Sequence, residues 1–181
     1  MKKVFAIAAL AIVGISAKAQ TVSSTATQTV NLALSNAIEL TFTGSGTATG
    51  AAVTIPFTSV TDYANGVESA AQQLKVRSNK AFGVTVKANA ANFTYTGTTS
   101  PAPTMPVSGV LAAKVSTNGT GGTIAGTFGS YTSLTSSAQN LISNGTNGGN
   151  QTFSVMYNAT PGFAYPAGTY TVDVVYTATQ N

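Results

Sequence analysis

Short runs in which apolar and polar residues alternate recur along most of this chain, and they constrain its fold more than any other feature. Successive side chains of a β-strand point to opposite faces, so alternation over four to eight residues indicates a half-buried strand. The runs cover residues 30–34, 38–42, 53–57, 74–76, 82–86, 93–95, 107–115, 124–128, 153–157 and 170–176. Helical periodicity is nearly absent. Because glycine, proline and asparagine separate the runs as turn residues do, the sequence predicts an all-β protein.

The number and spacing of these runs predict a single immunoglobulin-like Greek-key β-sandwich over residues 20–181. Within it, segments 74–76 and 82–86 are expected to pair as a hairpin that turns at residues 78–80. Asn65 and Gly66 are a strong turn signal. Segment 134–142 fits either a short helix or a further strand. No repeat of fixed period is present, which argues against a solenoid or a propeller.

The amino terminus has the three parts of a secretory signal peptide. Two lysines follow Met1, an apolar run extends over residues 4–15, and Ala17-Lys18-Ala19 fits the A-x-A cleavage pattern. The apolar run is too short to span a bilayer, which takes about 20 residues, and no second run of that length follows. We therefore expect residues 1–19 to be removed, leaving a mature chain without a transmembrane span. It is predicted to be extracytoplasmic, at the cell surface or secreted, with the periplasm as an alternative.

Removal of the signal peptide changes the charge of the molecule. Five basic and four acidic residues are left in 20–181, which gives a net charge of +1. Nucleic-acid binding needs a stripe of cations to neutralise phosphates, and five scattered cations do not form one. Thr, Ser, Asn, Gln and Gly dominate the rest, so little like-charge repulsion opposes association with copies of the chain or with other envelope proteins.

The residue types that most catalytic sites require are missing. The chain contains no histidine and no cysteine, which removes the commonest metal ligands and nucleophile partners and also excludes disulfides. Its four carboxylates, at positions 39, 62, 68 and 173, are scattered, and Asp62 and Glu68 are interpreted as solvated residues flanking a turn. The sequence predicts no enzyme activity, no catalytic or metal-binding residue and no cofactor.

Two stretches resemble the bacterial pilin-like and WxL-like immunoglobulin-type surface proteins. They read LKVRSNKAFGVTV at 74–86 and PAGTYTVDVVY at 166–176, and they are similar to the mid-domain hairpin and the closing strand of these families. The resemblance spans roughly residues 28–179. The chain lacks the Trp-x-Leu motifs that attach WxL-like proteins to peptidoglycan, and it lacks the cysteine pair that is common in chaperone-usher pilins. The resemblance implies a non-enzymatic surface protein with an immunoglobulin-type fold.

The first functional hypothesis is a structural, pilin-like subunit that assembles by strand pairing. The segment that follows the cleavage site carries its apolar residues on one parity, with Val22, Ala26, Val30, Leu32 and Leu34 on the same face of an extended strand. Such a segment either forms the first strand of its own domain or adds to the sheet edge of a neighbour.

The second hypothesis is a cell-wall or glycan-binding β-sandwich module. Exposed aromatic rings stack on sugar rings, and the candidates near the end of the chain are Tyr165, Tyr170 and Tyr176. Tyrosines on strands also pack in cores or in cross-strand pairs, which leaves a purely structural interpretation of these three open.

Overall fold

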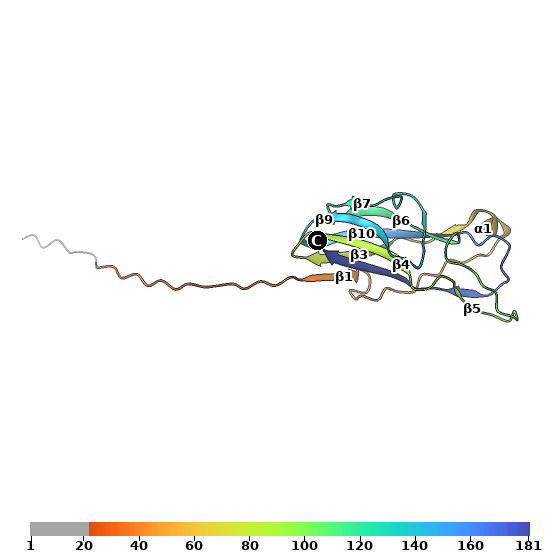
Figure 1. The fold of residues 1–181 in the computed structure, drawn as a ribbon, viewed down its shortest axis with the longest axis horizontal. Helices are drawn as coiled ribbons and strands as arrows, with labels where there is room; N and C mark the ends of the chain where they lie inside the picture. Colours follow the sequence, from red (N-terminus) through yellow and green to blue (C-terminus); the bar gives the residue numbers. More distant parts are fainter. Residues whose placement is uncertain (1–21) are drawn as a thin grey trace, which may run out of the picture. The chain divides into compact units, whose positions relative to one another are not determined.

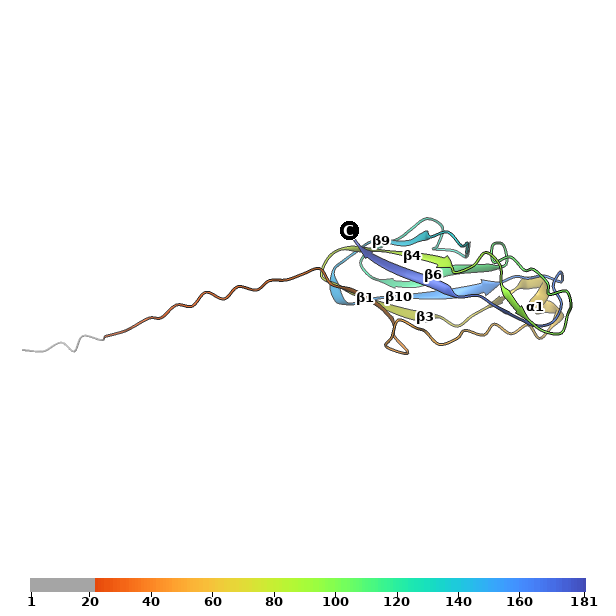
Figure 2. The same ribbon diagram turned by 60° about the horizontal axis from the view of Figure 1, so that its bottom comes forward.

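The structure, a computed structural model, describes residues 22–181, and the expected signal peptide therefore lies outside the described residues. Residues 35–181 form one compact unit, and segment 22–34 belongs to a separate one. Within residues 35–181, the start of β1 and the C-terminus lie at one end, and α1 and β5 lie at the opposite end (Figures 1 and 2).

Three antiparallel sheets make up residues 35–181. The first has the strand order β1 (Ile38–Phe42), β3 (Gln72–Ser78), β10 (Gly148–Ala159), β6 (Leu111–Gly119) and β8 (Thr132–Ser133), with β2 (Val67–Glu68) also paired to β10. The second has the order β12 (Val174–Gln180), β4 (Phe82–Ala88), β9 (Gln139–Gly145) and β7 (Thr123–Ile124). A third sheet contains only β5 (Thr94–Thr96) and β11 (Thr169–Thr171). One short helix, α1 (Val60–Asn65), lies between β1 and β2.

The two larger sheets pack face to face because each has one apolar face. Alternate residues of their central strands are buried in the shared core: Leu74, Val76, Phe153 and Val155 from the first sheet, and Phe82, Val84, Val86 and Leu141 from the second. Burying one such side chain contributes about 1.5–3 kcal/mol to folding. The predicted all-β sandwich is confirmed, and the alternation that predicted it marks the core positions.

The strand order follows that of an immunoglobulin-type sandwich. That fold has strands A, B, E and D in one sheet and strands C, F and G in the other. In the first sheet β1, β3, β10 and β6 take the places of A, B, E and D, and in the second β4 and β12 take those of C and F. No strand among the described residues pairs with β12 on its outer side, where strand G lies in the complete fold.

The expected hairpin over residues 74–86 is wrong. β3 pairs with β1 and β10, whereas β4 pairs with β12 and β9, so residues 79–81 carry the chain from one sheet to the other. Ser78 supports this crossing, because its hydroxyl donates to the Lys80 carbonyl at 2.7 Å. Alternation shows which face of a strand is buried, but both sheets bury their inner faces, so the pattern cannot distinguish pairing from crossing.

Residues 53–57 and the turn signal at Asn65-Gly66 also differ from expectation. Residues 53–57 join no sheet, and the turn signal marks the C-terminal end of α1. Ser59 and Asp62 form a capping box at the start of this helix. Gly66 has a φ of 81°, and a Cβ there would approach the Ala159 carbonyl oxygen at 2.8 Å, so this position favours glycine.

Four other segments differ in their boundaries or are now defined. Residues 107–110 form a turn before β6. Of the run 124–128 only Ile124 lies in a strand, together with the preceding Thr123. Segment 134–142 is not a helix, since its second half belongs to β9. The closing run divides at Asp173 into β11 and β12, which join different sheets, and Asn89 donates a hydrogen bond to the Asp173 carboxylate at 2.8 Å.

Segment 22–34 contains no strand, and all of its residues are exposed. The first strand therefore begins at Ile38, and of the two alternatives for residues 30–34 the first, a strand of their own sandwich, is wrong. The alternating apolar residues of 30–34 pack against no sheet in the part of the chain that the structure describes. Residues 22–181 contain no helix long and apolar enough to cross a membrane.

Candidate assembly site

β12 is an edge strand of the second sheet, and no described strand pairs with its outer side. In an antiparallel pair, a residue bonds to its partner strand through both its N–H and its C=O, and the next residue directs both groups away. Two hydrogen bonds of 2.9 Å fix this pattern for β12 and β4: the Asn181 amide donates to the Ala81 carbonyl, and the Asn89 amide donates to the Asp173 carbonyl. In the register of the two strands, the odd-numbered residues of β12 are therefore the ones that bond to β4. The backbone groups of the even-numbered residues of β12 therefore face outward along this edge.

β1 is the corresponding edge of the first sheet, and it lies on the same side of the sandwich. The Phe42 and Tyr176 rings meet edge to face, with centroids 6.2 Å apart. The Gln180 side chain donates to the Ala37 carbonyl at 2.8 Å and to Asn79 Oδ1 at 2.9 Å. The two unpaired edges are therefore held close together, one from each layer.

The core is only partly covered between these two edges. Five apolar side chains here pack against the core but are half-buried, in contrast to the fully buried centre: Leu40, Phe42, Val174, Tyr176 and Ala178. A further strand beside β12 would place alternate side chains over this row. The geometry fits an extended segment whose apolar residues recur at every second position.

Tyr176 lies at the centre of this row and has a buried hydroxyl. Its hydroxyl oxygen is 2.7 Å from that of Tyr157 on β10, so the pair connects the two sheets across the core. Burial raises the pKa of Tyr176 well above its usual value of 10, and burial also raises the pKa of Tyr157. Both tyrosines therefore stay protonated and bonded at neutral pH.

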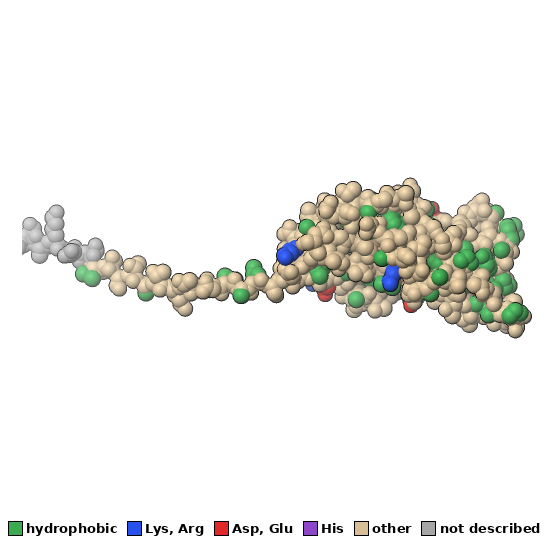
Figure 3. Space-filling view, viewed as in Figure 1, with side chains coloured by type: hydrophobic (Ala, Val, Ile, Leu, Met, Phe, Trp, Pro, Cys, Tyr) green, Lys and Arg blue, Asp and Glu red, His purple; other side chains and the backbone are tan. Residues whose placement is uncertain are grey.

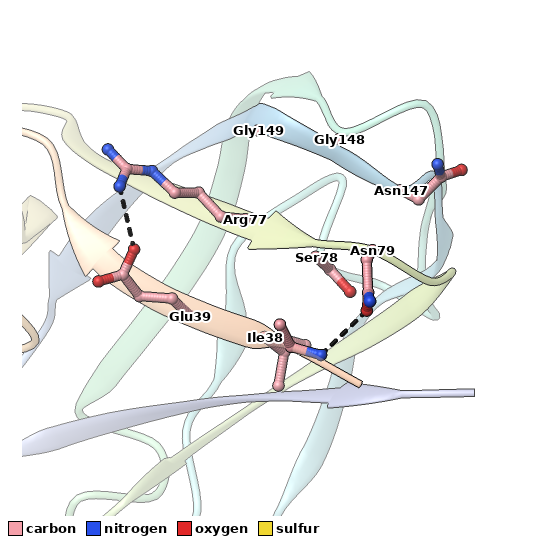
Figure 4. Close-up of a pocket in the computed structure, with 9 residues that line it drawn as sticks. Ile38, Glu39, Arg77, Ser78, Asn79, Asn147, Gly148 and Gly149 are labelled. Carbon is pink, nitrogen blue, oxygen red and sulfur yellow. Dashed lines mark hydrogen bonds and ion pairs between the residues drawn. The ribbon is translucent and has the colours of Figure 1, made fainter. Parts of the chain in front are cut away.

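A surface hollow lies at the end of the sandwich where β1 begins. We call it the base hollow; its lining includes Ile38, Glu39, Arg77, Asn79, Asn147 and Gly148. Figure 4 shows Glu39 and Arg77 pointing toward each other across β1 and β3, at 3.4 Å between Oε2 and Nη1. Asn79 Oδ1 accepts a hydrogen bond from the Ala37 amide at 3.0 Å, and its Nδ2 donates to the Ser35 carbonyl at 2.8 Å. The exposed ion pair contributes little, whereas Asn79 fixes the backbone that enters β1.

The five residues predicted for an assembly strand all lie in the exposed segment. Val22 is 94% exposed, Leu34 is 88% exposed, and Ala26, Val30 and Leu32 are exposed as well. Neither this segment nor β12 contains a charged residue. The sequence indicated the apolar parity of the segment. It could not identify the edge of β12, because that edge depends on which strands pair.

The three tyrosines proposed as glycan-facing residues do not lie together. Tyr165 and Tyr170 are in contact, with ring centroids 6.3 Å apart, and Tyr95 on β5 packs on Tyr170 at 5.0 Å. Tyr176 belongs to the core edge described above, which is a structural role. The hydroxyls of Tyr170 and Tyr95 donate to the carbonyls of Pro166 and Ala167, at 2.8 and 3.1 Å.

Sequence reasoning missed further aromatic residues near this pair. Tyr63 on α1 packs on Phe57 and stacks on Phe163, with centroids 5.3 and 5.6 Å apart. Phe163 and Tyr165 share the loop 161–166, which brings the two groups to the same end of the sandwich. We call this surface the aromatic tip; it comprises Val60, Tyr63, Tyr95, Phe163, Tyr165 and Tyr170. Figure 3 shows apolar side chains gathered at this end. The sequence signal that could have indicated the tip was the pair Phe163 and Tyr165, which lies between two prolines and outside any alternating run.

Each of the four carboxylates contacts another group of the chain. Asp62 accepts hydrogen bonds from the amides of Thr58 and Ser59, at 2.7 and 2.8 Å, and these bonds lower the pKa of Asp62. Glu68 lies 3.9 Å from Lys114, and Glu39 and Asp173 contact Arg77 and Asn89 as described above. No two of them face a shared hollow among the surface features described. No protein-family model and no curated protein sequence matches this chain.

Proposed function

We propose that this protein is an exported, non-enzymatic structural subunit that assembles with copies of itself by adding its amino-terminal segment to the edge of β12 in a neighbour. One observation carries the proposal. The sandwich has an unpaired edge strand beside a half-covered row of core side chains, and the same chain carries an exposed, alternating segment that joins no sheet.

The residue pattern of the segment suits this edge. Added to β12, the segment would direct its even-numbered side chains, among them Val30, Leu32 and Leu34, toward the row formed by Val174, Tyr176 and Ala178. Each buried Val or Leu contributes about 1.5–3 kcal/mol before the cost of association is subtracted. The odd-numbered residues, such as Asn31, would face solvent. Main-chain hydrogen bonds to the outward groups of β12 would supply the rest of the affinity.

Strand addition also resolves a hazard of this fold. An unpaired edge attracts other strands, and natural proteins usually protect edges with charges, prolines or bulges. The sequence of β12, VVYTATQ, contains neither a charge nor a proline. A segment from a neighbouring copy would cover that edge with a defined partner.

A single substitution tests the proposal, with a matched control at the neighbouring position. Leu32→Lys places a charge on the parity that would enter the core row, where an unpaired ammonium is costly to bury. Asn31→Lys adds the same charge on the opposite parity. We expect the wild-type protein and Asn31→Lys to form multimers, and Leu32→Lys to stay monomeric, in light scattering and electron microscopy. Equal behaviour of the two variants, or a wild-type protein that stays monomeric at high concentration, would refute strand addition.

The glycan-binding alternative has less support in the geometry. Only two of its three tyrosines come together, and the hydroxyl of Tyr170 is committed to a backbone carbonyl rather than directed outward. The exposed ring of Phe163 beside them is the one observation that favours it. A monomeric variant retained on a polysaccharide column would support this alternative.

A further inference from the structure

The aromatic tip exposes apolar surface that the sandwich itself does not use. Phe163 is 67% exposed and Val60 is 75% exposed, although Phe163 is stacked on Tyr63. Asp62 is the only charged residue in the segments that build the tip, 57–66, 92–106 and 160–171, and its carboxylate is occupied by the amides that start α1. Apart from Asp62, the segments that build the tip therefore present only uncharged side chains, and few charges would have to lose water on contact with a partner.

The direction of β12 determines which surface would meet this tip if the proposed strand addition occurs. β12 begins next to β11, near the tip, and ends at Gln180, whose side chain bonds to Ala37 and Asn79 at the opposite end. The amino-terminal segment joins the sandwich at Ser35, which Asn79 also holds at that end. Each copy therefore has its tip where β12 begins, and its base hollow where the segment is attached.

Two orientations of the added segment have different consequences. A segment antiparallel to β12 would run from the base of the acceptor toward its tip, so its own sandwich would follow at the tip. A parallel segment would bring base against base, which is a self-complementary contact that closes as a dimer. Only the antiparallel arrangement repeats without closing. The amino-terminal segment is long enough to cover the whole of β12, because residues 22–34 in extended form reach about 43 Å whereas β12 covers about 23 Å.

Resting on the proposed function, we infer that the aromatic tip is a docking surface for the base hollow of the next copy. The hollow can take an exposed ring, since Gly149 has open space where a side chain would be, and Ile38 and Asn147 line the same hollow (Figure 4). In an assembly, every tip except the terminal one would be covered in this way.

The chain has no cysteine, which allows site-directed cross-linking. Ala164→Cys marks the tip and Asn147→Cys marks the base, both at exposed positions. After treatment of assembled protein with a short bis-maleimide and denaturation, the double variant should give a ladder of multimers and each single variant should stay monomeric. A dimer from Asn147→Cys alone would show base-to-base contact, and a dimer from Ala164→Cys alone would show tip-to-tip contact; either result would overturn the inference.

A second pair separates failure of this inference from failure of the proposed function. Asn31→Cys with Thr177→Cys reports strand addition, because both positions would lie on the outer face beside each other. Cross-links from this pair, without any from the tip–base pair, would leave strand addition intact and overturn the docking of the tip. Independently, Phe163→Ser should raise the concentration needed for assembly about tenfold. Retention of the Leu32→Lys monomer on a polysaccharide column, lost on adding Phe163→Ser, would assign the tip to a glycan and overturn the inference.

Discussion

The hydroxyl pair of Tyr157 and Tyr176 shows how one contact can decide the role of a residue. Both rings are directed inward, and each hydroxyl finds its partner across the core at 2.7 Å. The alternating runs 153–157 and 170–176 place Tyr157 and Tyr176 on the same face as their apolar neighbours, and both tyrosines pack at the core. The alternating pattern could not show that Tyr176 would reach a tyrosine of the other sheet, because that contact depends on the spacing of the two layers.

Replacing Tyr176 with Phe should lower the free energy of unfolding by about 1–2 kcal/mol at pH 7, because the Tyr157 hydroxyl loses its partner. Urea titration measures this change, with Tyr63→Phe as the control, expected within about 0.5 kcal/mol of wild type. The folded pKa of both tyrosines is raised above 10, so the folded protein keeps protons that the unfolded chain releases. The wild type should therefore lose stability as pH rises above 10, and Tyr176→Phe should lose it less steeply. Equal alkaline slopes would contradict this assignment.

At the level of elements, the sequence predicted where most strands lie but not which strands pair. The inner positions of β3, β4 and β10 were correctly indicated, because burial imposes alternation on each strand by itself. The hairpin at 78–80 was wrong because sheet membership depends on distant partners, such as β1 and β10 for β3. The open edge of β12 was invisible for the same reason.

Asn79 connects three elements at the crossing between the sheets. Its side chain bonds to Ser35 and Ala37 at the entrance to β1 and to Gln180 at the end of β12. Asn79→Ala should lower the free energy of unfolding by about 1–3 kcal/mol, because several hydrogen bonds are lost together. Asn140→Ala, at an exposed position of β9, is the matched control and should change it by less than about 0.5 kcal/mol. If the two variants unfold at the same urea concentration, Asn79 does not hold these elements together.

For the whole molecule, the arrangement of sheets provides one edge that suits a partner strand. The two larger sheets bury their centre fully, whereas the side between β1 and β12 leaves a row of half-buried residues. The chain also carries a neutral alternating segment outside the compact unit. The sequence indicated this segment by its parity, but the acceptor edge and the aromatic tip became visible only from the pairing of strands and the packing of loops.

Amide hydrogen exchange along β12 tests the central claim most directly. In the monomeric Leu32→Lys variant, the amides of Tyr176 and Ala178 should exchange rapidly because they face the unpaired edge, whereas Val175 and Thr177 should be protected by β4. In assembled wild-type protein, Tyr176 and Ala178 should become protected while Val175 and Thr177 change little. If Tyr176 and Ala178 exchange as fast in the assembly as in the monomer, β12 is not the edge to which the amino-terminal segment is added.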